Sequence, residues 1–257
     1  MSEREKVEKI TSWLKNKLVN SGCEGFVVGV SGGIDSAVTS TLCALTNIPL
    51  LVLNMPIYQD PKQVHRSDEH IGWLKDKFNN IESYKLDLTK TFEVFKETIS
   101  LDAHEGNSLA NSRSRIRMVT LYAYANAKNY LVVGTGNKVE DYGVGFFTKY
   151  GDGGVDVSPI ADLLKSEVYE LAKHLDVVKS IQSAPPTDGL WGDDRTDEEQ
   201  IGATYEELEW ALRFHDSRLS EDDLTQRQKK VLDIYRDRHF KNKHKLETPP
   251  VCIITNF

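Results

Sequence analysis

Phe26-Val-Val-Gly-Val-Ser-Gly-Gly-Ile-Asp-Ser36 is the stretch of this sequence that decides the fold. Its apolar, β-branched first half predicts a buried strand, and residues 37–45 after it predict a helix. The two adjacent glycines between them let backbone N–H groups face outward, beside the positive N-terminal end of the helix. Such a turn is an anion cradle that suits phosphate. Because Asp35 within the cradle would repel a phosphate, the motif indicates an intervening cation, Mg²⁺.

Two common nucleotide-binding motifs do not describe this turn. A Walker A loop ends in Gly-Lys-Ser/Thr, whereas Ile34, Asp35 and Ser36 stand in that place here, and the pattern is not G-x-G-x-x-G either. The turn resembles the SGGxDS loop of the ATP pyrophosphatases, which cleave ATP between its α and β phosphates. The alternative interpretation is an ordinary strand–turn–helix connection in which the aspartate caps the helix.

Strands and helices alternate along the rest of the chain. Strands are predicted at residues 50–55, 84–88 and 130–133, and helices at residues 7–18, 59–78, 89–99, 109–128 and 163–175. A capping box at 196–199 opens a helix, and two more are predicted near 203–214 and 221–240. The alternation predicts an α/β fold: a parallel central sheet of the Rossmann type, covered by helices on both faces, with a helical C-terminal part. With no low-complexity linker and no repeat, a single domain is expected over residues 1–257.

The composition narrows the classes of function. A formal net charge of −7 argues against a general nucleic-acid surface, which needs a basic face. Cys23, Cys43 and Cys252 have no metal-binding spacing, and we expect each to be a small buried hydrophobic residue in a reducing cytoplasm. The N-terminal segment lacks the apolar core of a signal peptide, and no apolar run is long enough to span a membrane. We therefore expect a cytoplasmic protein that binds neither nucleic acid nor membranes.

Two of the predicted strands end in glycine-rich turns, after Val30 and after Val133. Ligands of open α/β sheets bind at the carboxyl ends of strands, so both turns should open onto one crevice if the two strands are neighbours. Glu140 follows the second turn and could meet Asp35 across Mg²⁺, which binds one or two carboxylates together with substrate phosphates. The alternative for Glu140 is an exposed carboxylate on a helix face.

A second glycine-rich stretch, Phe146-Phe-Thr-Lys-Tyr-Gly-Asp-Gly-Gly-Val-Asp156, suits a backbone that bends closely around a ligand. A tight surface turn is the alternative. Upstream, Arg113 and Arg117 would share one face of the predicted helix, while Arg115 points elsewhere. One of the three arginines could bind a ligand carboxylate or phosphate, and the other two would form a solvated basic face.

Over nearly its whole length, the chain resembles the ammonia-dependent NAD synthetases. The resemblance is carried by residues 29–36, 111–118, 134–140, 146–156, 186–187, 196–198 and 244–245. It implies a fold like that of the adenine nucleotide alpha hydrolases. It also implies a reaction in which deamido-NAD, ATP and ammonia give NAD, AMP and pyrophosphate through an NAD-adenylate, carried out by a homodimer.

The resemblance implies a role for each matching residue. Asp35 and Glu140 would bind Mg²⁺, and the catalytic residues would be Asp35, Lys165 and Asp156. ATP would be bound by Gly29, Val30, Ser31, Gly32, Gly33, Ile34, Asp35, Ser36, Thr135, Lys165 and Thr187. Deamido-NAD would be bound by Arg115, Lys149, Asp156, His244 and Lys245. Asp156 is also a candidate base for deprotonating ammonium, although capture of neutral ammonia would suffice.

Three further expectations concern the loops and the nitrogen source. Some relatives have one residue fewer between Glu140 and Phe146, and Leu246 follows the His-Lys pair where a basic residue is common. Residues 183–195 would form either a lid over the adenylate, with Trp191 as its apolar cover, or a plain connection. Because the motifs begin at residue 29, no glutaminase domain is expected, and free ammonia is the expected donor.

Other functions remain open at this point. Another ATP pyrophosphatase, such as a GMP synthetase or a tRNA-modifying enzyme, would share the first motif, although an RNA enzyme should show a basic face. A non-catalytic nucleotide sensor of the same fold would bind ATP without releasing AMP.

Overall fold

The computed structural model describes residues 1–99, 106–187, 196–217 and 219–254. Its centre is a parallel four-stranded sheet, as predicted, and the order of the strands is β3-β2-β1-β4. The strands are β1 (Gly25–Gly29), β2 (Leu50–Asn54), β3 (Ile81–Lys85) and β4 (Tyr130–Val133). The helices are α1 (Glu3–Ser21), α2 (Ile34–Ala44), α3 (Pro61–Lys77), α4 (Thr89–Ile99), α5 (Gly106–Lys128), the π-helix η1 (Lys138–Val144), α6 (Lys165–His174), α7 (Lys179–Gln182), α8 (Asp197–Ile201), α9 (Tyr205–Asp216) and α10 (Gln226–Leu246).

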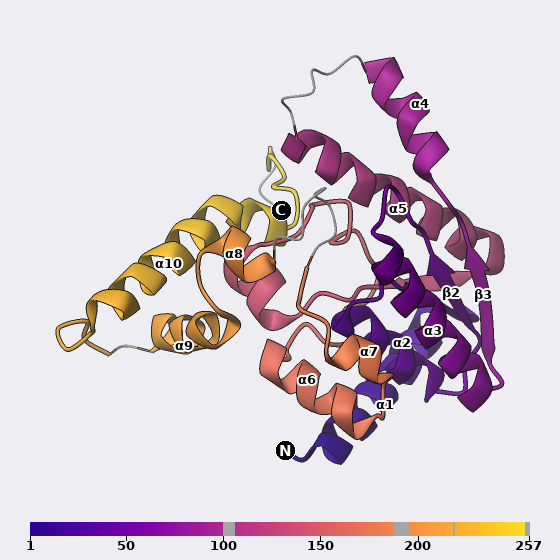
Figure 1. The fold of residues 1–257 in the computed structure, drawn as a ribbon, viewed down its shortest axis with the longest axis horizontal. Helices are drawn as coiled ribbons and strands as arrows, with labels where there is room; N and C mark the ends of the chain where they lie inside the picture. Colours follow the sequence, from indigo (N-terminus) through magenta and orange to yellow (C-terminus); the bar gives the residue numbers. More distant parts are fainter. Residues whose placement is uncertain (100–105, 188–195, 218, 255–257) are drawn as a thin grey trace.

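Both faces of the sheet are buried, which explains why its central strands are continuous apolar runs rather than alternating ones. Phe26 and Val28 of β1 point into a cluster with α1, α2, α3, α6 and α7. Val27, between them, points to the opposite face, where α5 packs. The helices around the sheet are seen in Figure 1. The predicted α/β architecture with helices on both faces is therefore confirmed.

A separate apolar cluster holds the C-terminal helices together. It contains side chains of α8, α9 and α10, and also Val139 and Val144 of η1. These C-terminal helices lie to one side of the sheet (Figure 1). Because η1 directly follows the turn after β4, this cluster joins the C-terminal helical part to the carboxyl edge of the sheet.

Some boundaries differ from those predicted. Helix α2 begins at Ile34 rather than at residue 37, because Gly33 is its N-cap, and Asp35 therefore lies in the first helical turn. Strand β3 covers 81–85 rather than 84–88, because it pairs with β2 from Ile81 onward. Residues 138–144 form a π-helix, which was not among the elements predicted from the sequence.

Of the three cysteines, Cys43 is buried as expected, but Cys252 is exposed and Cys23 is half-buried. The expectation that all three are buried was wrong, because Cys252 follows the last helix in an extended, exposed tail. Within the described ranges, none of the helices is long and apolar enough to cross a membrane.

Candidate active site

The turn between β1 and α2 is a rigid backbone cradle. The hydroxyls of Ser31 and Ser36 lie 3.2 Å apart, and the Ser36 hydroxyl also donates to the Gly33 carbonyl at 2.9 Å. Because α2 starts at Ile34, its first-turn N–H groups have no partners within the helix. They and the helix dipole make this turn a site for anions.

Helix α3 braces the cradle from behind. Ser67 donates to the Val30 carbonyl at 2.8 Å, and Arg66 Nε donates to the Gly32 carbonyl at 3.3 Å. Gly32 has a φ of +84°, and a Cβ there would lie 2.5 Å from the Gln63 carbonyl oxygen. Only glycine fits this position without strain, because both the backbone conformation and the neighbouring carbonyl exclude a side chain.

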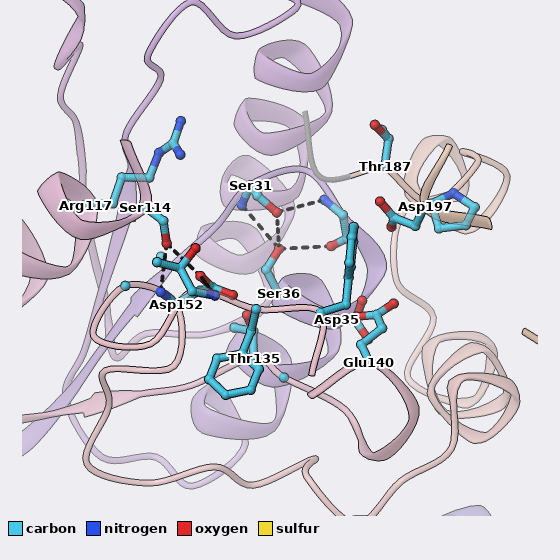
Figure 2. A pocket seen from close by; sticks show the side chains of 18 of the residues that line it. Ser31, Asp35, Ser36, Ser114, Arg117, Thr135, Glu140, Asp152, Thr187 and Asp197 are labelled. Atoms are coloured by element: carbon cyan, nitrogen blue, oxygen red, sulfur yellow. Dashed lines mark hydrogen bonds between the residues drawn. The ribbon is translucent and has the colours of Figure 1, made fainter. Parts of the chain in front are cut away.

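The cradle opens into a cavity of about 580 Å³ at the carboxyl ends of β1, β2 and β4. Ser31 and Ser36 lie at its centre, with Ser114 and Arg117 on one side and Glu140 on the other (Figure 2). The turns after β1 and β4 do share one crevice, because the two strands pair directly. Of the ATP-binding residues predicted, the cavity is lined by Gly29, Val30, Ser31, Gly32, Gly33, Ile34, Asp35, Ser36, Thr135, Lys165 and Thr187.

Lys165 connects the two predicted metal ligands. Its Nζ lies 2.6 Å from Asp35 Oδ2 and 2.7 Å from Glu140 Oε1, so both carboxylates face the same point. Lys165 is only 3 % exposed, although it begins a helix. Burial disfavours its charged form, but the two carboxylates outweigh burial and raise its pKa. Burial raises the pKa of Glu140, and Lys165 opposes this shift. Lys165 is therefore a buried residue of the site, not a lysine on the surface of its helix.

Asn137 holds this pair of carboxylates from the turn after β4. Its side chain is completely buried and donates from Nδ2 to Asp35 Oδ1 at 3.1 Å. Its Oδ1 accepts from the backbone N–H groups of Val139 and Glu140, so it also caps η1. Sequence analysis did not identify Asn137. Its position directly after a Gly-Thr-Gly turn and before a helix was the available signal.

Asp141 is a third carboxyl group near this point. It lines the cavity, and burial together with the charges of Asp152, Glu140 and Asp35 raises its pKa well above the ordinary value. A Cβ at Gly136 would lie 1.7 Å from Asp141 Oδ2, so the glycine makes room for this side chain.

The residues present fit a Mg²⁺ ion that is shared with substrate phosphates, rather than one whose ligands all come from the protein. Asp35 and Glu140 supply hard carboxylate oxygens, and a cationic nitrogen already lies between them. Within the described residues, no group of three or more His, Cys, Asp or Glu side chains is arranged to hold a metal. Two carboxylates completed by substrate phosphates and water are the usual set for Mg²⁺.

The glycine-rich stretch 146–156 folds against α5. Asp152 accepts from the Ser114 hydroxyl at 2.6 Å and from the Thr148 N–H at 3.0 Å. A Cβ at Gly151 would lie 2.3 Å from Ser114 Oγ, so the turn is packed tightly. Several of its residues, including Asp152, also line the cavity. The stretch is therefore a structured wall of the site rather than a plain surface turn.

Four predicted deamido-NAD residues come together around the end of α10. Lys245 donates to the carbonyls of Gly145 and Phe147 at 2.9 and 2.8 Å, and Lys149 donates to the His244 carbonyl. Arg115 Nε donates to the Lys149 carbonyl at 3.3 Å. Lys245 lines the cavity, whereas Arg115, Lys149 and His244 lie outside its lining residues.

Asp156, the remaining predicted residue, is placed differently. Its Oδ2 accepts from the Val132 N–H at 2.8 Å and its Oδ1 accepts from the Tyr122 hydroxyl at 2.9 Å. It lies outside the cavity lining, and its carboxylate fastens the glycine-rich stretch to β4. Trp191 and most of the loop 183–195 lie outside the described residues, so the lid stays a prediction.

The three arginines of α5 have three different partners. Arg113 lies over the Phe92 ring of α4, and Arg115 contacts Lys149. Arg117 donates to the Met55 carbonyl at 2.9 Å and to Gln59 Oε1 at 3.0 Å, and it lines the cavity. Burial, followed by the charge of Arg113, lowers its pKa to about 10. Of these three arginines, Arg117 is therefore the one at the cavity, whereas the resemblance had implied Arg115 as the ligand-binding arginine.

The fold and the site together define a class: α/β proteins with a glycine-turn anion site at the carboxyl ends of parallel strands, beside a pair of buried acidic side chains. The family model described as NAD synthase matches residues 6–249, and the chain belongs to this family.

Comparisons with individual proteins support the same family. The NH(3)-dependent NAD(+) synthetase of Alkaliphilus oremlandii is 38 % identical over 255 residues, which cover 95 % of each chain. Among solved structures, an NMN synthetase from Francisella tularensis has a TM-score of 0.85 and 36 % identity, with both chains covered completely. An NH3-dependent NAD synthetase from Campylobacter jejuni has a TM-score of 0.79 and 28 % identity, covering 98 % of this chain and 100 % of that one.

Proposed function

We propose that this protein amidates deamido-NAD to NAD with free ammonia, using ATP and releasing AMP and pyrophosphate. The observation that carries the proposal is the meeting of Asp35, Glu140 and Lys165 beside the 31–36 cradle, in a chain of the NAD synthase family. A cradle for departing pyrophosphate and acidic metal ligands are the two features that cleavage of ATP between the α and β phosphates needs.

The chemistry follows from the leaving group. Ammonia cannot displace oxide from the nicotinate carboxylate, so that carboxylate first attacks the α-phosphorus of ATP, and pyrophosphate leaves. The resulting NAD-adenylate then reacts with ammonia at the acyl carbon, and AMP departs from the tetrahedral intermediate. The N–H groups at the start of α2 would hold the pyrophosphate, and Lys165 would neutralise charge on the phosphates.

Asp35 and Glu140 would hold Mg²⁺, which would supply positive charge to the phosphate oxygens. Lys165 keeps both carboxylates oriented toward that place, and Asn137 fixes the direction of Asp35.

Ammonium must lose a proton before its nitrogen can attack the acyl carbon. Asp156 stays our predicted candidate for the base that accepts this proton. Both of its oxygens already accept hydrogen bonds, from Val132 and Tyr122. This supports capture of neutral ammonia as the simpler route.

The test is an incubation with ATP, Mg²⁺, deamido-NAD and either ammonium or glutamine, in which NAD and AMP are measured. We expect NAD with ammonium and none with glutamine. Absence of NAD with ammonium would overturn the proposal, and ATP binding without AMP release would identify a nucleotide sensor instead.

A second candidate substrate is nicotinate mononucleotide, which the same chemistry would convert to NMN. The observation that favours it is the greater likeness to the Francisella NMN synthetase than to the Campylobacter NAD synthetase, in both TM-score and identity. The curated relatives that match most of the chain are named as NAD synthetases, so deamido-NAD stays the first candidate. A comparison of kcat/KM for the two acids under saturating ATP and ammonium decides between them.

We also propose a cytoplasmic homodimer. Trp13 and Val19 of α1 and Val119 of α5 are exposed apolar residues, and these two helices are our candidates for the interface. Burial of such residues between two copies would be favourable. Light scattering should then give twice the chain mass of 29.1 kDa. A monomer at assay concentrations would contradict this proposal.

A further inference from the structure

Tyr205 reaches the carboxylate pair from the C-terminal helical part. Its hydroxyl donates to Glu140 Oε1, the same oxygen that accepts from Lys165, and lies 3.3 Å from Asp197 Oδ2. Its ring lies beneath the Lys165 ammonium, with 5.0 Å between Nζ and the ring centroid. Tyr205 therefore contacts both Glu140 and the lysine that bridges it to Asp35.

The fold holds this phenol in place. Tyr205 is the first residue of α9, directly after its N-cap Thr204, and is 8 % exposed. Its ring belongs to the same apolar cluster as Val139 and Val144, which flank Glu140 on η1. Its hydroxyl therefore lies between the carboxylates of Glu140 and Asp197, where it can only donate.

The hydrogen bond limits the orientation of Glu140. An oxygen that accepts from a phenol and from an ammonium at the same time has its direction set by two donors on different elements, α9 and α6. The second oxygen of the carboxylate is then directed as well, because the group is planar. Residues that orient metal ligands in this way change metal affinity roughly 10- to 100-fold when they are removed.

We propose that Tyr205 is a positioning residue of the metal site: it donates to Glu140 and so fixes the carboxylate that, with Asp35, holds the ATP-bound cation. This inference rests on the proposed function only in so far as the site binds a divalent cation together with ATP. It gives the C-terminal helices a part in the site, because they carry the donor.

The chain offers a matched pair of substitutions for the test. Tyr205→Phe removes the hydroxyl but keeps the ring under Lys165. Tyr235→Phe removes a hydroxyl from another buried tyrosine of the same cluster, whose ring stacks on His239. Within the described residues, no hydrogen bond joins Tyr235 to Asp35, Glu140 or Lys165.

The probe is Mn²⁺, followed by electron paramagnetic resonance in the presence of α,β-methylene-ATP, which cannot be cleaved between the α and β phosphates. We expect Tyr205→Phe to weaken Mn²⁺ binding about tenfold. The concentration of Mg²⁺ for half-maximal activity should rise in parallel, while the KM for ammonium stays unchanged. Tyr235→Phe should bind Mn²⁺ like the wild type.

The proposal would be overturned if the Mn²⁺ affinity of Tyr205→Phe lay within twofold of the affinities of the wild type and of Tyr235→Phe. An equal loss of Mn²⁺ affinity in Tyr235→Phe would also overturn it, because loosening of the cluster would then explain the effect. If Tyr205→Phe does not fold, the wild type and Glu140→Gln bound to Mn²⁺ are compared by ultraviolet difference spectra of tyrosine, and an unchanged tyrosine signal counts against the proposal. Failure of the wild type to form an amidated product would contradict the proposed function but would leave the Mn²⁺ comparison decisive.

Discussion

At the scale of single residues, the site is a small charge cluster with an excess of negative charge. Asp35 and Glu140 face one lysine, and Asp141 lies close by with a raised pKa. A buried cation between two carboxylates is favourable only where geometry and hydrogen bonds are good, and here Asn137 supplies a further donor. The remaining negative charge favours a second cation.

The substitution Asp35→Asn tests this arrangement at its centre. It keeps the shape of the side chain but removes the charge that faces Lys165, so we expect kcat to fall by about 100-fold or more. Pyrophosphate release under saturating ATP is the measurement. Circular dichroism should show an intact fold, and near-wild-type pyrophosphate release would exclude a role for the Asp35 charge.

Asn137→Ala removes a completely buried amide with three hydrogen bonds. We expect it to lower the free energy of unfolding by about 2 kcal/mol, since it removes an N-cap and leaves Asp35 without one donor. It should also lower kcat. The control Thr225→Ala removes the N-cap of α10 and should cost about 1 kcal/mol in urea denaturation with kcat unchanged. Equal effects of both variants on kcat would contradict the role given to Asn137.

The residues at the site were predictable where they carry a motif. Asp35 and Glu140 follow glycine turns after buried strands, and the pairing of β1 with β4 places those turns together. Asn137 was missed although its N-cap position gave a local signal, because its bond to Asp35 joins distant elements, and Tyr205 was missed for the second reason alone. Tyr205 is separated from Glu140 by several helices along the chain, and nothing local to 205 indicates that its hydroxyl points into the sheet's carboxyl edge.

At the scale of elements, the cradle depends on α3 as much as on its own glycines. Gly32 packs against the Gln63 carbonyl, and Arg66 and Ser67 hold the backbone of the turn. The helix therefore acts as a fixed wall behind the phosphate site.

Gly32→Ala is expected to destabilise the protein by about 1–2 kcal/mol, because it forces a left-handed conformation on a residue with a Cβ. It should also raise the KM for ATP, because the cradle must shift away from Gln63. Gly72→Ala is the matched control on α3: it has open space around it and should stabilise the protein by about 0.5–1 kcal/mol. Thermal unfolding and ATP titration measure both effects. Equal stabilities for the two variants would contradict this account of the turn.

Element boundaries were less predictable than element types. Residues 84–88 were predicted as a strand, but Leu86 and Leu88 instead pack beside α5 after β3 has ended. The π-helix η1 has no distinctive pattern of its own, because it is held by Asn137 and by the cluster with α9 and α10. Both cases depend on tertiary contacts that a local pattern does not contain.

At the scale of the whole molecule, stability should depend on pH through His70. This histidine is 0 % exposed at the packing of α3 on α2, contacts Ser40 at 3.0 Å, and stacks on Trp73. Burial lowers its pKa from 6.5 to about 4. In that interval the unfolded chain binds a proton that the folded protein does not, so stability is lost as the pH falls from 6.5 toward 4.

The expected loss from His70 is about 3 kcal/mol at pH 4. It is measured by urea denaturation at a series of pH values, as the difference in the free energy of unfolding between the wild type and His70→Gln. The variant should lose less stability on acidification, whatever its stability at neutral pH. The exposed residue His65, changed in the same way, should leave the pH dependence of the wild type unchanged. If the free energy of unfolding falls with pH in the same way for the wild type and for His70→Gln, the prediction is refuted.

The segment from Gly134 to Asp156 begins and ends at the same place on β4. Gly134 N–H donates to the Val157 carbonyl at 2.8 Å, Val133 and Val157 form a parallel bridge, and Asp156 holds the Val132 N–H. The entropy of closing such a loop rises only slowly with its length, by about 0.6 kcal/mol for each doubling. The cost of changing the length between Glu140 and Phe146 therefore lies in packing rather than in closure, because η1 and Val144 pack against the C-terminal helices. An insertion between Glu140 and Phe146 should accordingly disturb the C-terminal cluster and the cavity wall at Gly145 together.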